Sequence, residues 1–328
     1  MIELLGGAAG STTEMYLTMG ALLVLCFLIG TAAVVAGVGG GVMFVPLASA
    51  LFAIHVDFVR GAGLMVALVG AIAAAPALME RRLSRIRISI PLALAGSVGS
   101  VIGARLGLLV PENAIMLALA ILMLAVAGQT AYQGWRDYRR QNRLAADGGN
   151  ERSTPSPTAA GTADTAPANL NEPTNVPPEG LSARLVRSWG LYGSYLDPGS
   201  GEEVSWQARR IVPAMVLFIG IGMIGGALGV GAGWANVPVL ASLMGLPVKM
   251  AAATSGLIIV ANSGAAAWVY LRQGALDPLI VMPAVAGMIA GTRVGARLLG
   301  RARPETVRLL VVTVLVLAGA RTLWGVLT

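Results

Sequence analysis

Long apolar segments fill most of this 328-residue sequence, and only 12% of its residues are charged, against about 25% in an ordinary soluble domain. Several of these segments run for about 18 residues or more without Asp or Glu, which is the length that a helix needs to cross a bilayer. The pattern predicts an all-α polytopic membrane protein and excludes most soluble enzyme folds. The expected segments are 16–37, 42–54, 61–79, 88–109, 114–131, 211–229, 234–246, 250–271, 278–299 and 306–327.

The later segments repeat the earlier ones. Gly229 lies 192 residues after Gly37 (229 − 37), and the same shift superimposes many further residues without a gap. It pairs Val45-Pro46 with Val237-Pro238, and Gly103-Ala104-Arg105-Leu106 with Gly295-Ala296-Arg297-Leu298. The sequence therefore predicts an internal duplication, and most duplicated membrane folds are transporters.

Arginines in the short loops predict how the two halves are oriented. The stretches 81–87 and 136–143 should be cytoplasmic, because short loops rich in Arg remain inside. In the second half the loop equivalent to the first of these, 272–277, is nearly neutral, and the arginines lie in the next loop, 301–308. Equivalent loops thus fall on opposite faces. We predict two inverted five-segment repeats, with the N- and C-termini outside.

The second segment of each half is short. Segments 42–54 and 234–246 have 13 residues each, about 20 Å of helix at about 1.5 Å per residue, which is too little to span a bilayer comfortably. Each could cross the membrane or re-enter it as a half-helix. The sequence therefore predicts about eight to ten transmembrane helices.

A polar region divides the chain into a first transmembrane repeat at 1–131, a cytoplasmic loop at 132–210 and a second transmembrane repeat at 211–328. Residues 147–180, rich in Pro, Thr, Ala and Asn, are typical of a disordered linker. Beyond them, the turn sequence at 197–201 predicts a small β-hairpin. This loop has as many acidic as basic residues, so the net charge of +7 belongs to the membrane part and does not indicate a nucleic-acid partner.

Glycine-rich runs at 37–41 and 229–233 adjoin the two short segments. Glycine lets the backbone adopt positive φ and approach a ligand closely. A half-helix N-terminus beside such a turn presents unpaired N–H donors and the positive end of the helix dipole, which suit an anion at mid-membrane. The alternative is that these glycines only allow tight turns and close packing. The predicted substrate-binding glycines are Gly39, Gly40, Gly41, Gly231 and Gly233.

Small polar side chains near the second glycine run are further candidates for binding a substrate. Thr254, Ser255 and Asn262 belong to the segment 250–271, and Asn236 lies just after the glycines. Ser255 and Asn262 are about two helical turns apart and share one face. Neutral donors suit a weakly bound anion that must also leave. Hydrogen bonding between helices is an equally good explanation of these residues.

Three arginines fall within or near the ends of predicted spans. An intramembrane Arg is costly and often functional, so Arg105, Arg293 and Arg297 could form an anion-attracting vestibule. Near a helix end, however, a long side chain can also extend to the membrane interface. The sequence leaves both roles open.

Together these motifs resemble a known family. The doubled glycine run followed by Val-Pro, the Ala253-Thr254-Ser255 triplet and the Gly-Ala-Arg-Leu segment ends are similar to those of the sulfite exporter TauE/SafE family of sulfonate uptake permeases. The similarity covers both membrane halves. It implies transport of small sulfur oxyanions, organosulfonates or carboxylate-type anions across the bacterial inner membrane. Because Ala62-Gly63 replaces Thr254-Ser255 in the first half, we expect an asymmetric substrate site.

The absence of certain residue types narrows the function further. No Asp or Glu lies deep within a predicted span, and Cys26 and His55 are the only residues of their types. We therefore expect no metal site, no cofactor and no enzymatic activity. We predict a multi-pass inner-membrane exporter whose partners are a small anion and the bilayer. We expect it to be a uniporter, because the membrane potential alone can drive the efflux of an anion. The sequence leaves open whether the chain also forms a homo-oligomer. A scaffold acting through the cytoplasmic loop and a channel for another small solute remain alternative functions.

Overall fold

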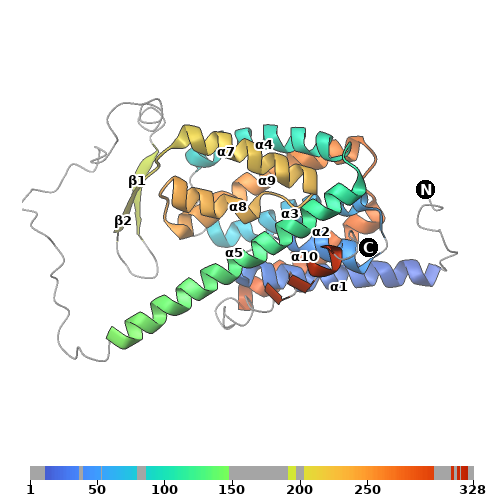
Figure 1. Cartoon of the computed structure of the whole chain (residues 1–328), viewed down its shortest axis with the longest axis horizontal. Helices are drawn as coiled ribbons and strands as arrows, with labels where there is room; N and C mark the ends of the chain where they lie inside the picture. The colour runs from blue at the N-terminus through green and yellow to red at the C-terminus, as the bar shows by residue number, and fades with distance from the viewer. Residues whose placement is uncertain are drawn as a thin grey trace, which may run out of the picture.

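The structure is a computed structural model that describes residues 12–36, 40–52, 54–79, 86–147, 191–196 and 203–298, together with short helical pieces at 312–313, 316–317 and 319–323. Apart from one two-stranded hairpin, the regular structure of the described part is helical (Figure 1). The helices are α1 (Thr12–Ala36), α2 (Gly40–Leu51), α3 (Val56–Met79), α4 (Ile86–Gly107), α5 (Glu112–Asp147), α7 (Ile211–Leu228), α8 (Gly233–Pro238), the π-helix η1 (Val239–Leu243), α9 (Val248–Arg272) and α10 (Pro278–Leu298).

Seven of the described helices are long and apolar enough to cross a membrane, namely α1, α3, α4, α5, α7, α9 and α10. Large apolar side chains cover their outer faces. On α4, for example, Ile90, Leu94 and Val98 are exposed at every fourth position, and Leu94 is 64% exposed. Such a stripe is unfavourable in water and suits contact with lipid. The prediction of an all-α polytopic membrane protein is confirmed.

The short segments are present at the expected places. Helix α2 has 12 residues, and α8 has 6 residues and continues as the 5-residue π-helix η1. Each contains a proline, Pro46 in α2 and Pro238 in α8, which removes a backbone donor and interrupts regular α-helical hydrogen bonding. The expected segment 306–327 lies largely outside the described residues.

Two pairs of helices pack parallel through glycines. Carbonyl oxygens of α1 lie against α10, and carbonyl oxygens of α7 lie against α4, at positions where a Cβ atom would collide with the backbone. Close contact through small residues is the usual way in which membrane helices associate. The contacts are Leu23 with Gly287, Phe27 with Gly291 and Thr31 with Gly295, and Ile219 with Gly99, Met223 with Gly103 and Ala227 with Gly107.

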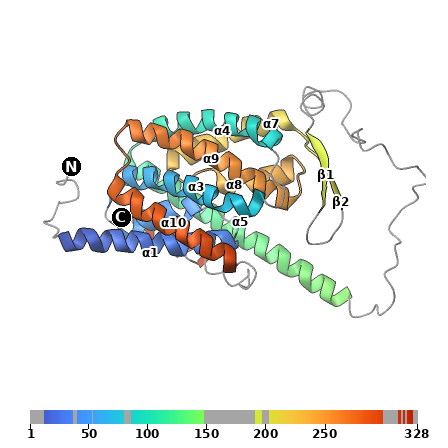
Figure 2. The ribbon, with the colours of Figure 1, turned by 180° about the vertical axis from the view of Figure 1, so that it is seen from behind.

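Helices α3 and α9 cross the middle of the bundle side by side (Figures 1 and 2). Arg60 near the start of α3 lies over Tyr270 near the end of α9. Gly231 contacts Ala67, which is later in α3, and Ser263, which is earlier in α9. The two helices therefore run antiparallel. The largest buried apolar cluster joins α1, α2, α3, α5 and α10. A second cluster lies at the end of the bundle where α4 and α7 begin.

Helix α5 is longer than its apolar segment. Only Glu112–Gln129 has the composition of a span, yet the helix continues to Asp147, 16 residues past the boundary expected at 131 (147 − 131). This polar extension has no proline to end it. It projects from the bundle in Figure 1. The linker predicted at 147–180 falls almost entirely within 148–190, outside the described residues.

A hairpin follows these residues. Strands β1 (Tyr192–Leu196) and β2 (Glu203–Gln207) pair antiparallel around the predicted turn sequence. The base of the hairpin is attached to the membrane helices. Leu191, Trp206 and Ala208 are buried in the cluster that contains the starts of α4 and α7, and the Arg209 N–H donates to the carbonyl oxygen of Met244 at 3.0 Å. The hairpin therefore contacts the loop that follows η1.

Candidate functional site

The turn between α7 and α8 depends on glycines. Helix α7 ends at Leu228 and is followed by Gly229, which has φ +71°, and Gly231 has φ +69°. Side chains other than glycine rarely adopt these angles. The turn lies against the start of α2, because a Cβ atom on Gly41 would lie only 2.7 Å from the carbonyl oxygen of Val230. Gly231 in turn lies beside α9, where its Cβ position would be 3.2 Å from Ser263 Oγ.

Helices α8 and α9 contain buried polar groups that have no hydrogen-bond partner in the described part of the chain. The side chain of Asn236 is fully buried, and neither its amide nitrogen nor its oxygen has a hydrogen-bond partner among the described residues. The same holds for the hydroxyls of Thr254 and Ser263, whereas Ser255 is buried beside Thr254. Leaving one such group unsatisfied costs about 1–3 kcal/mol. Groups of this kind are found where water or a ligand supplies the missing bond.

Asn262 links α9 to α4. Ser97 Oγ donates to its Oδ1 at 3.3 Å, and Ser100 Oγ donates to its backbone carbonyl oxygen at 2.9 Å. Gly96 leaves room for the amide, and Asn262 Nδ2 has no partner among the described residues. The two serines are one helical turn apart on α4, a spacing that the sequence analysis did not interpret. They extend the predicted set of polar residues to a third helix.

The polar positions have apolar counterparts in the first half. Moving 192 residues back places Phe44 at Asn236, Ala62 at Thr254, Gly63 at Ser255, Gly70 at Asn262 and Ala71 at Ser263. The space at Gly70 is occupied by the side chain of Met288. A polar cluster of this composition therefore occurs once in the described structure.

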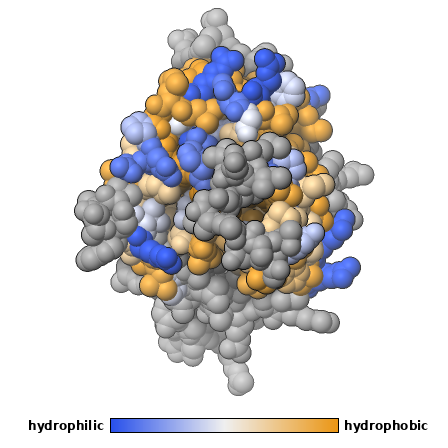
Figure 3. All heavy atoms as spheres, turned by 90° about the vertical axis from the view of Figure 1, so that its right-hand side faces the viewer, coloured by the Kyte–Doolittle hydropathy of each residue, from blue (hydrophilic) through white to orange (hydrophobic). Residues whose placement is uncertain are grey.

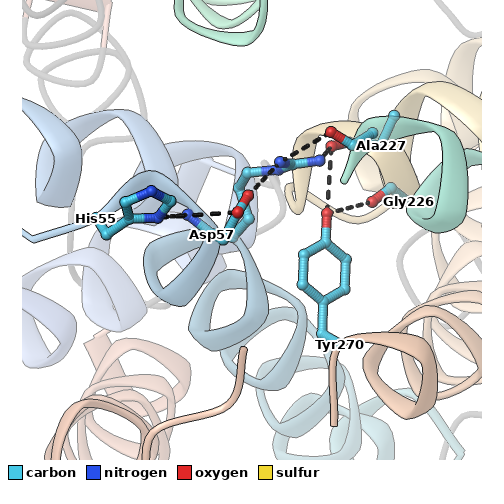
Figure 4. Close-up of polar contacts among 7 residues, drawn as sticks. His55, Asp57, Gly226, Ala227 and Tyr270 are labelled. Carbon is cyan, nitrogen blue, oxygen red and sulfur yellow. Dashed lines mark hydrogen bonds and ion pairs between the residues drawn. The ribbon is translucent and has the colours of Figure 1, made fainter. Parts of the chain in front are cut away.

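A second polar cluster surrounds Arg60 (Figure 4). Its guanidinium is only 1% exposed and donates to Asp57 Oδ1 at 2.6 Å, to the carbonyl oxygen of Gly107 at 3.3 Å and to that of Ala227. The Tyr270 hydroxyl donates to Gly226 and Ala227 at 3.2 and 3.3 Å. Arg60 is the only buried charged side chain among the described residues.

This cluster marks one end of the bundle, which we call the Arg60 end. It contains the start of α3 and the C-termini of α4, α7 and α9, and it faces the viewer in Figure 3, where hydrophilic patches alternate with apolar side chains. His55 lies at its surface, 58% exposed, with Nδ1 3.8 Å from Asp57 Oδ2. His55, Asp57 and Arg60 fall between the predicted segments 42–54 and 61–79. The available signal was Asp57 and Arg60, one turn apart at the start of an apolar segment.

The three predicted vestibule arginines do not lie together. Arg105 is at the Arg60 end, whereas Arg293 and Arg297 are in the last turns of α10, which begins at the Arg60 end and so ends at the opposite one. All three are exposed. Arg293 and Arg297 continue the exposed stripe of α10 that includes Leu279 and Met282, which favours the interface-anchoring role among the two that the sequence leaves open.

Comparison with known proteins identifies the family. The family model described as sulfite exporter TauE/SafE matches residues 22–322, nearly the whole chain. The chain belongs to the TauE/SafE family. It is also similar to the probable membrane transporter protein YunE of Bacillus subtilis (strain 168), with 27% identity over 135 residues, 41% of this chain and 49% of YunE. The match thus spans about half the length of that curated relative, and no solved structure matches.

Family membership confirms the resemblance read from the glycine runs and the Gly-Ala-Arg-Leu ends. This TauE/SafE protein has seven described helices that are long and apolar enough to cross a membrane, and it belongs to a family of membrane transporters. The described residues contain no group of three or more His, Cys, Asp or Glu that could hold a metal ion.

The structure brings some of the predicted site residues of this TauE/SafE transporter close together. Gly41 lies against the turn that contains Gly231, and Gly233 begins α8 three residues before Asn236. Gly40 is buried at the start of α2, where its Cβ position would meet Met288. Gly39 falls in 37–39, outside the described residues.

Proposed function

We propose that this TauE/SafE transporter exports small sulfur-containing or organic anions, such as sulfite or organosulfonates, across the inner membrane. The observation that carries the proposal is a set of buried neutral polar groups on Asn236, Thr254, Asn262 and Ser263 that have no hydrogen-bond partner among the described residues. Of these residues, Ser263 lies against Gly231 in the Gly229–Gly233 turn. Amide and hydroxyl donors can bind an oxyanion. No Asp or Glu is buried among the described residues, so no interior carboxylate repels one.

In this proposal the anion is bound by backbone donors of the glycine turns and by the polar side chains. Gly231 and Gly233 contribute backbone groups next to Asn236, and Gly39, Gly40 and Gly41 contribute those of the first half. Thr254, Ser255 and Asn262 contribute donors from α9. The site is asymmetric, since Phe44, Ala62 and Gly70 occupy the counterpart positions.

We further propose that the two halves are inverted repeats. Three observations support this. Helix α1 packs parallel to α10, and α7 packs parallel to α4. Helix α10 begins beside Gly61, where Ala275 approaches α3, and reaches Gly70 at Met288, so it also runs parallel to α3. Helix α3 is antiparallel to α9, and α9 is parallel to α4 through the Gly96–Asn262 contact and the packing of Ala104 against the later part of α9. Therefore α1, α3 and α4 run opposite to α7, α9 and α10, their respective counterparts 192 residues away.

The proposed orientation follows from charge. With the arginine-rich loops inside, the Arg60 end faces outward together with both termini, and residues 132–210 with their hairpin are cytoplasmic. The exposed Arg209 and Arg210 at the start of α7 agree with this orientation.

The proposed driving force is the membrane potential. Proton- and sodium-coupled carriers commonly use buried carboxylates. An inside-negative potential favours efflux of a monovalent anion by about 2.3 kcal/mol per 100 mV, so no coupling ion is needed. Sulfite efflux from proteoliposomes should persist when pH and sodium gradients are removed at fixed potential. Loss of transport under those conditions would contradict uniport.

Ligand-induced stabilisation tests the substrate class. A ligand that binds only the folded protein at about 100 times its Kd should stabilise it by about 2.7 kcal/mol. Sulfite, sulfate, thiosulfate, taurine, isethionate and simple carboxylates should be compared in thermal melts of the purified protein. We expect a selective shift with a sulfur anion that is lost in Thr254→Val and Asn236→Ala. Ser242→Ala, which changes an exposed hydroxyl on η1, is the matched control and should retain the shift. No shift with any anion would reject the proposed substrate class.

A further inference from the structure

We propose that Asp57, Arg60 and Tyr270 form a latch that closes the Arg60 end of the transport path, and that a small anion releases it by replacing Asp57 on the guanidinium. We call these three residues the Arg60 latch. The inference rests on the proposed anion transport through the Gly229–Gly233 turn, and it assigns a gating role to a cluster outside that site.

The latch ties together elements from both halves of the chain. Arg60 belongs to α3, and its guanidinium donates to carbonyl oxygens in the last turns of α4 and α7. Tyr270 of α9 donates to the same turn of α7 (Figure 4). The Arg60 Cζ atom lies 5.3 Å from the centre of the Tyr270 ring. The carbonyls at a helix C-terminus have no partner within the helix and carry partial negative charge. Arg60 thus holds two helix ends with one cation.

The latch also contacts the glycine turn directly. A Cβ atom on Gly229 would lie 2.5 Å from both Cα and Cβ of Arg60, so the backbone of the turn rests on α3 at this residue. Any motion that separates α3 from the end of α7 must break the bonds of Arg60. Closure at this end and the shape of the turn are therefore coupled through one side chain.

An anion can compete for the guanidinium of Arg60 because the acceptors that now bind its N–H groups are weak or can be replaced. Asp57 is the only carboxylate bonded to Arg60 in the described structure, and it is 29% exposed at the surface of the Arg60 end. The other acceptors are neutral carbonyls, and Arg60 Nε has no partner among the described residues. An oxyanion offers the guanidinium the same charge and the same paired oxygens as Asp57.

Stability alone gives little reason for this arrangement. A buried ion pair contributes little net stability compared with apolar residues of similar size, because desolvation offsets the attraction. Removing one partner of such a pair, however, leaves the charge of the other partner uncompensated. Those properties suit a contact that must hold in one state and exchange partners in another.

Cysteine accessibility tests the latch independently of transport. Cys26 is the only cysteine and is buried, so Cys26→Ala with Ala232→Cys places a single reporter in the glycine turn. Ala235→Cys, on α8, is a second reporter. Both are buried in the described structure. The full-length protein in proteoliposomes is treated from each side with a membrane-impermeant methanethiosulfonate that carries either a sulfonate or a trimethylammonium group.

With Arg60 intact, modification from the Arg60 end should be slow. Arg60→Gln and Tyr270→Phe should accelerate it about tenfold, which corresponds to about 1.4 kcal/mol of latch energy, with both reagents alike. Asp57→Asn, which leaves Arg60 without its counter-charge, should accelerate the anionic reagent more than the cationic one. Arg272→Gln, an exposed arginine at the same end, is the control and should change neither rate.

The outcomes separate the latch from the proposed function. If Arg60→Gln, Tyr270→Phe and Asp57→Asn lower the melting temperature but leave both rates within about twofold of the parent, the cluster is only structural and the latch is wrong. Tyr270→Phe keeps the buried ring, so it remains informative if Arg60→Gln fails to fold. If the rates change as expected while no anion stabilises the protein, closure by the Arg60 latch stands, whereas its release by an anion and the proposed substrate class both fail.

Discussion

Asn262 of α9 packs its amide against Gly96 of α4, where a Cβ atom would lie only 2.9 Å from Asn262 Cγ. Gly70 lies 192 residues before Asn262, and Met288 lies 192 residues after Gly96. These two counterparts are also in contact, but here the glycine is on α3 and the larger side chain, that of Met288, is on α10. One junction between the halves is therefore polar and contains Ser97 and Ser100, whereas the other is apolar. This difference gives the proposed substrate path its asymmetry.

The Gly96 contact predicts that even one added methyl group is harmful. Gly96→Ala should destabilise the protein by about 1–3 kcal/mol, because the new Cβ overlaps the Asn262 amide. Thermal melting of the purified protein measures this. The double variant Gly96→Ala with Asn262→Gly should recover most of the loss. If the two effects simply add, the contact does not set the local packing.

The second prediction concerns the turn between α7 and α8, where Gly229 and Gly231 have positive φ angles. Gly231→Ala should cost about 1–2 kcal/mol, since an L-residue disfavours the left-handed region, and should reduce sulfite transport by moving the backbone next to Asn236. Gly220→Ala, in the middle of α7 with open space around its Cβ position, should be neutral or stabilising by about 1 kcal/mol. Equal effects of the two changes would contradict the role assigned to the turn.

Glycines between the parallel helices predict a different kind of defect. Gly103→Val and Gly291→Val should prevent normal folding, because the added side chains would meet the backbones of Met223 and Phe27. Gly128→Val on α5, where nothing lies within 4 Å of the Cβ position, is the matched control. Yield of monodisperse protein from the membrane measures the effect. Normal yield of the first two variants would disprove the packing.

Much of this fold could be predicted from the sequence because membrane helices are long and uniform. The apolar runs place α3, α4, α9 and α10 within a few residues, and the glycine runs identify the turn that precedes α8. The polar end of α5 was missed, since hydropathy marks where a span ends and not where a helix ends. Its continuation to Asp147 depends on helix-forming residues that remain helical outside the apolar segment.

The site could be predicted only in part, for a similar reason. Asn236, Thr254 and Asn262 stand out because polar residues are rare in apolar segments. Arg60 does not, because its burial is produced by Gly107 and Ala227, 47 and 167 residues away along the chain. Ser97 and Ser100 are ordinary helix residues until Asn262 is placed against them. No local pattern carries that information.

The exposed stripe on α10 leads to a prediction about its arginines. Arg297→Gln should leave the rate of sulfite transport within about twofold, because the side chain lies on the same exposed face as Met282 and can reach the interface from the last turn of the helix. Arg293→Gln should behave alike. A loss of about tenfold or more in transport, with normal melting, would instead support the vestibule role.

Attachment of the hairpin to the membrane helices gives the last prediction. Trp206 is buried with Leu191 against residues that begin α4 and α7, and the neighbouring Arg209 N–H bonds to Met244 after η1. Trp206→Ala should therefore cost about 3–5 kcal/mol and loosen the loop that follows η1. Limited proteolysis should then cut near the hairpin at lower protease concentration, while Gln207→Ala, whose side chain is only partly buried, should not change the digest. If both variants resist cleavage equally, the hairpin is not held by Trp206, and the loop after η1 keeps its position without it.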